Sequence, residues 1–340
     1  MNDFLRLPAE RQRAVFEETQ ARTGLPAPSI EKDFWVCWTL RELFEDHTWG
    51  RHLTFKGGTS LAKAWKLIER FSEDIDLVID REHLGFGGAT LSSNQQKRLK
   101  TECSRRIHAE LKPVLEARLR SLIPADRGWV LTGAAAAEDV DQQTLLFEYP
   151  SVFPTRSTYL RPVVKMEMGA RSQTEPSAQA AIQSYAAEVF PDVIRDHTFS
   201  IRTVAARRTF LEKALLLHEE TYRPTPADRA LVRKTGLARH YYDVYRLIEA
   251  GVAKEALADP GLLQQVVEHR QVFFRYSWMD YTTMRRGSLR LAPLPEQLDA
   301  WRQDYTSMRT EMFFGQAPDF EVVLKAIDDF VRQFNAPPAA

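Results

Sequence analysis

Cysteine is scarce in this sequence, which holds only Cys37 and Cys103 among its 340 residues. Two thiols are too few for a disulfide framework or a structural zinc site. Long apolar runs are missing as well: no stretch approaches about 18 consecutive apolar residues. The N-terminus alternates acidic and basic residues and lacks the apolar core of a signal peptide. We therefore expect a cytoplasmic protein without a membrane-spanning segment or a membrane partner.

Net charge is missing too, because 46 lysines and arginines balance 46 aspartates and glutamates. The overall charge therefore gives no general attraction to nucleic acid, and any affinity for phosphate has to come from a local patch. A phosphate loop of the Walker type, GxxxxGK[ST], does not occur. What remains is an ordinary globular composition, 44% hydrophobic and 27% charged, in a chain long enough for about two domains.

Hydrophobic periodicity divides the chain into an α+β domain, residues 1–205, and a helical domain, residues 206–340. The link of roughly ten residues between TLLFEYP and RPVVKMEMG is too short for a helical crossover, so these two strands are predicted to be antiparallel neighbours. In the first domain, helices are predicted at 8–22, 29–46, 60–71, 94–119 and 178–189, and strands at HLTFKGG, 72–80, WVLTGAA, TLLFEYP, RPVVKMEMG and FSIRTV. Ser29 is the predicted N-cap of the second helix, and Thr59 or Ser60 that of the third.

Two aspartates in the segment FSEDIDL are the first indication of chemistry. On a strand, Asp74 and Asp76 project from the same face, roughly 6 to 7 Å apart, while Ile75, Leu77 and Ile79 face a core. Carboxylates this close repel each other unless a cation lies between them, and hard divalent ions take such oxygen ligands. A two-metal site for phosphoryl transfer needs this arrangement, although a solvated acidic strand face has the same pattern.

The segment KGGTSL lies between a predicted strand and a predicted helix. Gly57 and Gly58 allow a ligand to approach the backbone closely, and the helix N-terminus offers N–H groups to an anion. Thr59 and Ser60 add hydroxyl donors. Three lysines add positive charge nearby: Lys56, Lys63 and Lys66. Taken alone, the segment favours a simpler interpretation, a tight strand–helix connection with a serine cap.

Together, the two segments place a phosphate-binding turn, one helix and a strand with Asp-x-Asp in succession. The block KGGTSLAKAWKLIERFSEDIDLVI resembles the AbiEii/AbiGii toxin family of nucleotidyltransferases, the toxins of type IV toxin–antitoxin systems. The segments IEKDFWV, RRTFLEKALLLHEE and ARHYYDVYRL resemble further motifs of that family, so the resemblance spans roughly residues 30–250. It implies a DNA-polymerase-β-like nucleotidyltransferase core with a mixed sheet, followed by a C-terminal helical bundle.

The resemblance also implies roles for individual residues. Asp74 and Asp76 match the metal-binding pair, Lys213 matches a lysine that contacts nucleotide phosphates, and Asp243 matches the aspartate of the fourth motif, so these four are the predicted catalytic residues. The predicted nucleotide-binding residues are Lys56, Gly57, Gly58, Thr59, Ser60 and Arg239. His240 replaces an aspartate found in many members and is not assigned its role. Without the family, Lys213 is typical of a lysine that reaches solvent, and Asp243 of a carboxylate near a helix start.

A third metal-binding carboxylate is expected from a later strand. Glu167 in RPVVKMEMG alternates with Val164, Met166 and Met168, which places it on a polar face. It is the candidate for the second metal's ligand or for the base that acts on the attacking hydroxyl. Glu148 in LLFEY is the second candidate. A solvated glutamate on a half-exposed sheet explains Glu167 equally well.

Two basic stretches in the second half of the chain are candidates for holding a large acceptor. The first comprises Arg207, Arg208, Lys213, Arg229, Arg233, Lys234 and Arg239. The second, FFRYSWMDYTTMRRGSLR, interleaves Phe274, Tyr276, Trp278 and Tyr281 with Arg275, Arg285 and Arg286. Such mixtures bind RNA phosphates and stack on unpaired bases. Aromatic residues at helical spacing also form the core of a helical bundle.

The sequence thus predicts an enzyme that binds an NTP with Mg²⁺ or Mn²⁺ and transfers its nucleotide to an acceptor, releasing pyrophosphate. The resemblance implies a growth-inhibiting toxin, linked to phage defence, whose acceptor is the 3′ end of tRNA and whose antitoxin is encoded separately. Two alternatives stay open: nucleotidylation of a protein or small molecule, and a nucleotide- or RNA-binding regulator with little catalysis. A binding module has no need of two adjacent carboxylates, which favours the enzyme.

Overall fold

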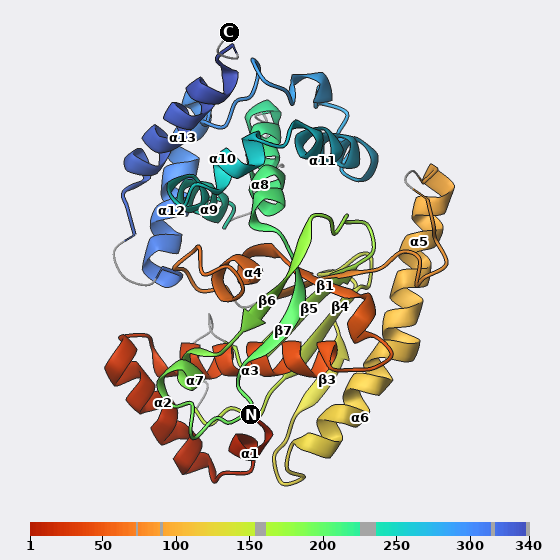
Figure 1. The fold of residues 1–340 in the computed structure, drawn as a ribbon, viewed down its shortest axis with the longest axis vertical. Helices are drawn as coiled ribbons and strands as arrows, with labels where there is room; N and C mark the ends of the chain where they lie inside the picture. Colours follow the sequence, from red (N-terminus) through yellow and green to blue (C-terminus); the bar gives the residue numbers. More distant parts are fainter. Residues whose placement is uncertain (73, 89–90, 154–160, 225–235, 314–316, 338–340) are drawn as a thin grey trace. The chain divides into compact units, whose positions relative to one another are not determined.

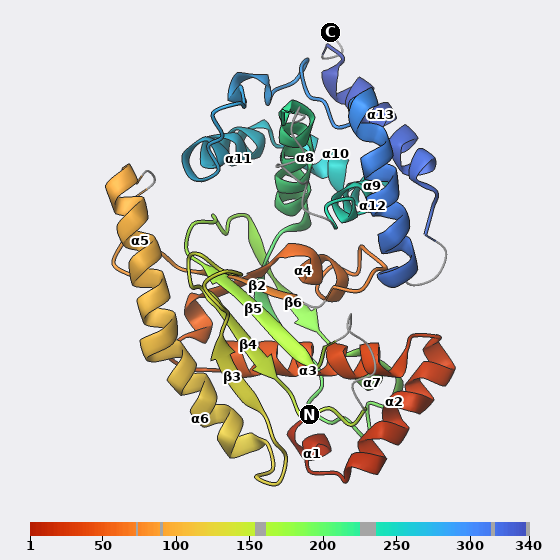
Figure 2. The ribbon, with the colours of Figure 1, turned by 180° about the vertical axis from the view of Figure 1, so that it is seen from behind.

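The computed structural model describes residues 1–72, 74–88, 91–153, 161–224, 236–313 and 317–337. The chain forms two compact units (Figure 1, Figure 2). The first comprises Met1–Trp65 and Ser72–Val204, and the second comprises Lys66–Phe71 and Ala205–Ala340. The short segment Lys66–Phe71, just before the strand that carries Asp74, therefore belongs to the second unit, and the chain returns to the first unit at Ser72. Within the described ranges, no helix is long and apolar enough to cross a membrane.

A seven-stranded mixed sheet forms the centre of the first unit, in the order β3-β4-β5-β2-β1-β7-β6. Its strands are β1 (Leu53–Lys56), β2 (Asp74–Ile79), β3 (Val130–Gly133), β4 (Thr144–Glu148), β5 (Val163–Gly169), β6 (Ser177–Ile182) and β7 (Phe199–Val204). β2 is parallel to β5 and β1 is parallel to β7, whereas the other neighbours are antiparallel. The sheet with its helices confirms the α+β class, and the antiparallel pairing of β4 with β5 confirms the prediction from their short link.

One face of this sheet is apolar and covered by a helix. The helices of the first unit are α1 (Asn2–Leu5), α2 (Ala9–Thr23), α3 (Ala27–Phe44), α4 (Gly57–Lys63), α5 (Ser93–Arg106), α6 (Lys112–Leu122) and α7 (Tyr185–Val189), with a 3₁₀ turn at Gly50–His52 and a π-helical turn at Ile107–Leu111. Trp35 and Trp38 of α3 lie against Phe147 of β4, with ring centroids 5.7 and 6.3 Å apart. Figure 1 shows α3 running across the strands. The other face of the sheet is therefore the one that can carry polar groups.

The second unit is helical, as predicted for the C-terminal part. Its helices are α8 (Ala206–Tyr222), α9 (Arg239–Glu249), α10 (Val252–Leu257), α11 (Pro260–Phe273), α12 (Leu298–Glu311) and α13 (Phe320–Asn335), with 3₁₀ turns at Tyr281–Thr283 and Pro295–Gln297. Tyr241 of α9 is fully buried between Trp301 of α12 and Phe320 of α13, at ring distances of 4.8 and 5.4 Å. These large rings form the core of the unit.

The helix predicted at residues 178–189 is wrong. Ser177–Ile182 forms the edge strand β6, which pairs with β7 along its whole length, and only Tyr185–Val189 is helical. The alanines of this segment favour a helix only weakly, and pairing with a neighbouring strand overrides that preference.

Three predictions of helix ends are also wrong. α3 begins at Ala27, after Pro26, so Ser29 lies inside its first turn. α4 begins at Gly57 with Lys56 at the N-cap, so neither Thr59 nor Ser60 caps it. The predicted helix over 60–71 ends at Lys63, and Lys66 has a left-handed φ of 53°. After Lys66 the backbone is no longer helical. It pairs with another segment of the second unit, where the Phe71 N–H donates to the Met312 carbonyl at 2.6 Å.

Candidate active site

Five charged residues share the polar side of the sheet where β1, β2 and β5 are neighbours. We call this set the charged face: Lys56, Asp74, Asp76, Lys165 and Glu167. Asp76 is paired with Lys56 on β1 and with Glu167 on β5, and Asp74 is paired with Lys165. Paired residues on neighbouring strands project to the same side. Ile75 and Leu77 project to the apolar side and are 0% and 3% exposed, so Asp74 and Asp76 lie on one face, as their alternation predicts.

The register separates the two candidates for a third carboxylate. Glu167 lies beside Asp76 on the adjacent strand. In β4, Thr144 is the residue level with Glu167, and Glu148 is level with Val163. Glu148 is therefore one strand further from β2 and roughly 13 Å further along the sheet. This position favours Glu167 over Glu148 as a partner of Asp76.

The carboxylates of the charged face already attract one cation, the ammonium of Lys165. Lys165 forms an ion pair with Glu167. Burial would lower the pKa of Lys165, but Glu167, followed by Asp74 and Asp76, outweighs burial and holds that pKa above its ordinary value. The position between these carboxylates thus favours positive charge, which is the electrostatic requirement of a metal site.

The donor set of the charged face fits a divalent ion in part. Asp74, Asp76 and Glu167 offer the oxygen ligands that Mg²⁺ and Mn²⁺ prefer. In the described ranges, however, no three acidic, histidine or cysteine side chains are grouped closely enough to hold a metal ion by themselves. Mg²⁺ is commonly held by one or two carboxylates together with substrate phosphates and waters. Asp74 and Asp76 are therefore sufficient protein ligands only if the nucleotide contributes the others.

Gly57 allows the Asp76 carboxylate to lie against the start of α4. A Cβ atom at Gly57 would lie 1.9 Å from Asp76 Oδ2, far inside contact distance. The φ of Gly57 is +80°, a region that disfavours any residue with a side chain. The KGGTSL pattern predicts that this glycine belongs to a nucleotide-binding turn, and in the structure Gly57 makes room for Asp76.

Replacing Gly57 with alanine tests this contact. We expect Gly57→Ala to displace the Asp76 carboxylate, to lower stability by more than the about 1–2 kcal/mol of left-handed strain, and to lower activity. Gly24→Ala is the matched control, because Gly24 has a φ of +75° but nothing within 4 Å of the added Cβ. Urea unfolding and nucleotide transfer of both variants would be compared. Equal losses in the two variants would contradict a specific role for the contact.

The hydroxyl groups of Thr59 and Ser60 are committed within the protein. Both side chains are fully buried. Thr59 Oγ1 donates to the Asp74 carbonyl, and Ser60 Oγ donates to the Gly57 carbonyl at 2.8 Å. Lys56 Nζ donates to Ser172 Oγ at 2.9 Å. The Thr59 bond ties the turn to β2, and the Ser60 bond closes the first turn of α4, so in this structure both hydroxyls position the turn.

Lys63 does not supply positive charge to a ligand, contrary to our expectation. It is 5% exposed, and its Nζ lies 2.8 Å from Asp33 Oδ1 and 3.6 Å from the ring centre of Tyr185. Although burial would lower the pKa of Lys63, Asp33 holds it above its ordinary value. Asp33 Oδ2 also accepts from the Tyr185 N–H at 2.7 Å. The segments IEKDFWV and KGGTSLAK thus meet through a buried ion pair that fixes the end of α4.

A second group of charged residues is buried in the second unit. Arg70 binds Asp243 with two parallel bonds, Nε to Oδ1 at 2.7 Å and Nη2 to Oδ2 at 2.8 Å. Lys213 Nζ lies 2.9 Å from Asp243 Oδ2. The three side chains are at most 9% exposed. We call this set the buried triad: Arg70, Lys213 and Asp243.

The protonation states of the buried triad follow from its contacts. Burial would raise the pKa of Asp243, but Arg70 and then Lys213 hold it far below its usual range. Burial lowers the pKa of Lys213, against the effect of Asp243. Burial and Lys213 lower the pKa of His240, whose Nδ1 lies 3.3 Å from Lys213 Nζ. A neutral imidazole there accepts from Lys213 and does not replace a carboxylate.

Lys213 and Asp243 were predicted from the sequence, whereas Arg70 was not. Arg70 precedes FSEDIDL directly, but its partner Asp243 is 173 residues away in the sequence. A local sequence pattern cannot predict a pairing between residues this far apart. Arg239, a predicted nucleotide-binding residue, begins α9 and is half-buried. Of the first basic stretch, Arg229, Arg233 and Lys234 lie outside the described residues.

The aromatic residues of the second basic stretch do not form a helical core. α11 ends at Phe273, and the following segment contains only a short 3₁₀ turn. Tyr276 is 39% exposed and stacks on Trp278 at 4.7 Å. Arg275, Arg285 and Arg286 are exposed nearby in the sequence. The exposed aromatic residues are still consistent with stacking on unpaired RNA bases. The alternative interpretation, that they form the core of a helical bundle, is wrong.

A family model described as "Nucleotidyl transferase AbiEii toxin, Type IV TA system" matches residues 38–331, most of the chain. The chain belongs to the AbiEii family of nucleotidyltransferase toxins. This membership confirms the predicted enzyme class and the predicted toxin–antitoxin system, and it implies an NTP substrate and an antitoxin partner. Members of such a family generally use a divalent metal ion.

Among solved structures, this AbiEii-family chain is similar to MenT4, a nucleotidyltransferase toxin from Mycobacterium tuberculosis H37Rv. The two chains share 15% sequence identity with a TM-score of 0.43, over 95% of this chain and 99% of MenT4. No curated protein matches the sequence. The assignment of this chain to its family therefore rests on the family model.

Proposed function

We propose that this AbiEii-family toxin transfers a nucleotide from an NTP to the 3′ end of an RNA, with tRNA as the expected acceptor, at the charged face. Asp74 and Asp76 hold a divalent ion, Mg²⁺ or Mn²⁺, and Glu167 is the third carboxylate. The observation that carries the proposal is the common face of Asp74 and Asp76, with Glu167 level with Asp76 on the neighbouring strand.

The reaction follows from these positions. The acceptor hydroxyl attacks the α-phosphorus, the bond from that phosphorus to the bridging oxygen breaks, and pyrophosphate leaves. Glu167 is the candidate to accept the hydroxyl proton, because it is the one carboxylate on the strand next to Asp76. Asp74 and Asp76 would hold a divalent ion, which would supply charge neutralisation at the phosphate oxygens. Positioning and fixed charge contribute most in such transfers.

Lys213, Asp243 and Arg239 belong to this proposal in different ways. Lys213 and Asp243 are bound to each other in the buried triad, which supports a positioning role beside the predicted contact with phosphates. Arg70 positions Asp243 with two bonds and lies in the segment that leads into β2. Arg239 remains a proposed nucleotide-binding residue, which contributes a positive charge.

Labelled NTPs test the proposed transfer directly. Purified protein with each α-labelled NTP, Mg²⁺ and total RNA is expected to yield labelled RNA of tRNA size. Label on the toxin itself or on a small molecule would favour the alternative acceptors instead. Retained NTP binding without label in any product would contradict the proposal and favour a regulator.

Removal of the Lys165 ammonium tests whether the charged face holds the metal. In Lys165→Met, the carboxylates lose the cation that competes with a divalent ion, so Mn²⁺ is expected to bind several-fold more tightly. Titration calorimetry or the electron paramagnetic resonance of free Mn²⁺ measures this. Lys254→Met is the control, because Lys254 is exposed on α10 in the other unit. Unchanged Mn²⁺ affinity in Lys165→Met would place the metal elsewhere.

A further inference from the structure

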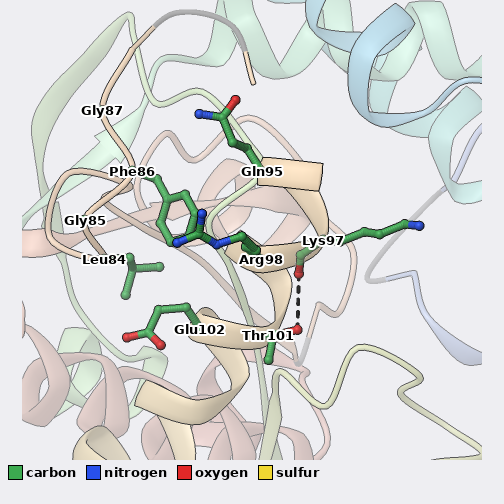
Figure 3. Close-up of a pocket in the computed structure, with 9 residues that line it drawn as sticks. All are labelled: Leu84, Gly85, Phe86, Gly87, Gln95, Lys97, Arg98, Thr101 and Glu102. Atoms are coloured by element: carbon green, nitrogen blue, oxygen red, sulfur yellow. Dashed lines mark hydrogen bonds between the residues drawn. The ribbon is translucent and has the colours of Figure 1, made fainter. Parts of the chain in front are cut away.

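A cavity of about 590 Å³ lies in the first unit, outside the charged face (Figure 3). It opens between the loop that follows β2 and the first turns of α5, and its lining includes Phe86, Gly87, Lys97, Arg98 and Glu102. None of the residues of the charged face lines it. Its volume lies within the range of about 300–1,000 Å³ that is typical of ligand pockets. No function discussed so far uses this cavity.

The charges around the cavity favour an anion. Glu102 is bound by Arg105, with Nε to Oε2 at 2.9 Å and Nη2 to Oε1 at 2.7 Å, so its carboxylate is compensated. Lys97 and Arg98 are exposed. Neither side chain forms a hydrogen bond or ion pair with another residue in the part of the chain that the structure describes. Two exposed cations therefore lie at this cavity.

A planar ring accompanies these cations. Phe86 is half-buried, and Figure 3 shows the Arg98 side chain pointing toward its ring. In the same view, Lys97 extends away from Phe86 and away from α5. A Cβ atom at Gly87 would meet nothing within 4 Å, so packing does not require a glycine there. A cation and an aromatic ring that line the same cavity are elements that can bind one nucleotide of a single strand.

We propose that this cavity binds one nucleotide of the single-stranded end of the acceptor RNA. Its base stacks on Phe86, its phosphate binds Arg98, and Lys97 binds the next phosphate along the strand. This inference rests on the proposed function, since it assigns a subsite to the RNA acceptor.

The place of the cavity favours an RNA strand over a free nucleotide. Asp74 and Asp76 occupy the first half of β2, whereas the cavity begins in the loop beyond Ile79, which lies roughly 10 Å further along the strand. The nucleotide in the cavity is thus not the one being transferred. A strand with successive phosphates can use both Arg98, which points into the cavity, and Lys97, which points away from it.

The test measures binding of a fluorescein-labelled single-stranded RNA of about 12 nucleotides to the full-length protein. In the double variant Lys97→Gln/Arg98→Gln we expect affinity to fall on the order of tenfold, and the slope of log Kd against log salt to fall by about 1.4. Phe86→Leu is expected to weaken binding roughly fivefold or more through lost stacking. The matched control is Arg6→Gln/Arg120→Gln, which removes two exposed cations of the same unit that do not line the cavity.

The outcomes separate this inference from the proposed function. Unchanged RNA affinity in the double variant, or equal losses in the control, would overturn the subsite. Weaker binding of labelled NTP with unchanged RNA binding would overturn it too, because the cavity would then hold a free nucleotide. If RNA binding depends on Lys97 and Arg98 although no label is transferred, the subsite stands and the proposed reaction fails. A raised KM for RNA with an unchanged KM for NTP supports both.

Discussion

Replacement of Asp76 with asparagine is expected to abolish nucleotide transfer. Asn keeps the shape of the side chain but removes the charge that, in the proposed function, would hold the divalent ion. Loss of a supporting group around a metal ligand typically costs about 10–100-fold, so loss of a ligand itself is expected to cost more than about a hundredfold. Label transfer to RNA at saturating Mg²⁺ measures the effect.

Two glutamates of the same sheet serve as controls for Asp76→Asn. Glu148→Gln is expected to leave transfer unchanged, because Glu148 is exposed and lies one strand further from β2, level with Val163. Glu167→Gln is expected to reduce transfer, because a glutamine side chain cannot accept the proton of the attacking hydroxyl. Full activity of Asp76→Asn would refute the site, and a loss in Glu148→Gln equal to that in Glu167→Gln would refute the choice between the glutamates.

Replacement of Arg70 with methionine is expected to destabilise the second unit strongly. Asp243 is 0% exposed and bound by Arg70 with two bonds, so the variant leaves a buried carboxylate with Lys213 as its remaining cation. Removal of one partner from a buried ion pair costs about 3–5 kcal/mol. Urea unfolding measures the loss. Because Arg70 lies just before β2, we also expect transfer activity to fall.

A second ion pair of the same segment provides the control for Arg70→Met. Arg246 of α9 binds Glu69 at 3.2 Å, and the two side chains are 32% and 66% exposed. Exposed pairs contribute about 0–1 kcal/mol, so Arg246→Met is expected to change stability little. A loss in Arg70→Met no larger than this control would show that the buried triad does not hold the segment. Arg70→Lys, which keeps the charge but not the paired bonds, is expected to fall between the two.

The features that could be predicted from the sequence are local ones. The alternation in FSEDIDL and RPVVKMEMG placed Asp74, Asp76 and Glu167 on polar strand faces, since side-chain direction on a strand depends only on position along the chain. The two glycines of KGGTSL marked the turn, although their use, making room for Asp76, depends on a residue of another strand. The edge strand β6 was missed because pairing with β7, and not the preference of its alanines, fixes its conformation.

Local patterns of residues were enough to predict the α+β class, the helical C-terminal part, the acidic pair and the family. Which charges are available to a ligand depends instead on how distant segments pack. The fold buries Lys63 against Asp33 and joins Arg70 to Asp243 across 173 residues, while it leaves Lys97 and Arg98 exposed at a cavity. Such pairings depend on contacts between distant segments, whose burial makes an ion pair obligatory, and no pattern of neighbouring residues records them.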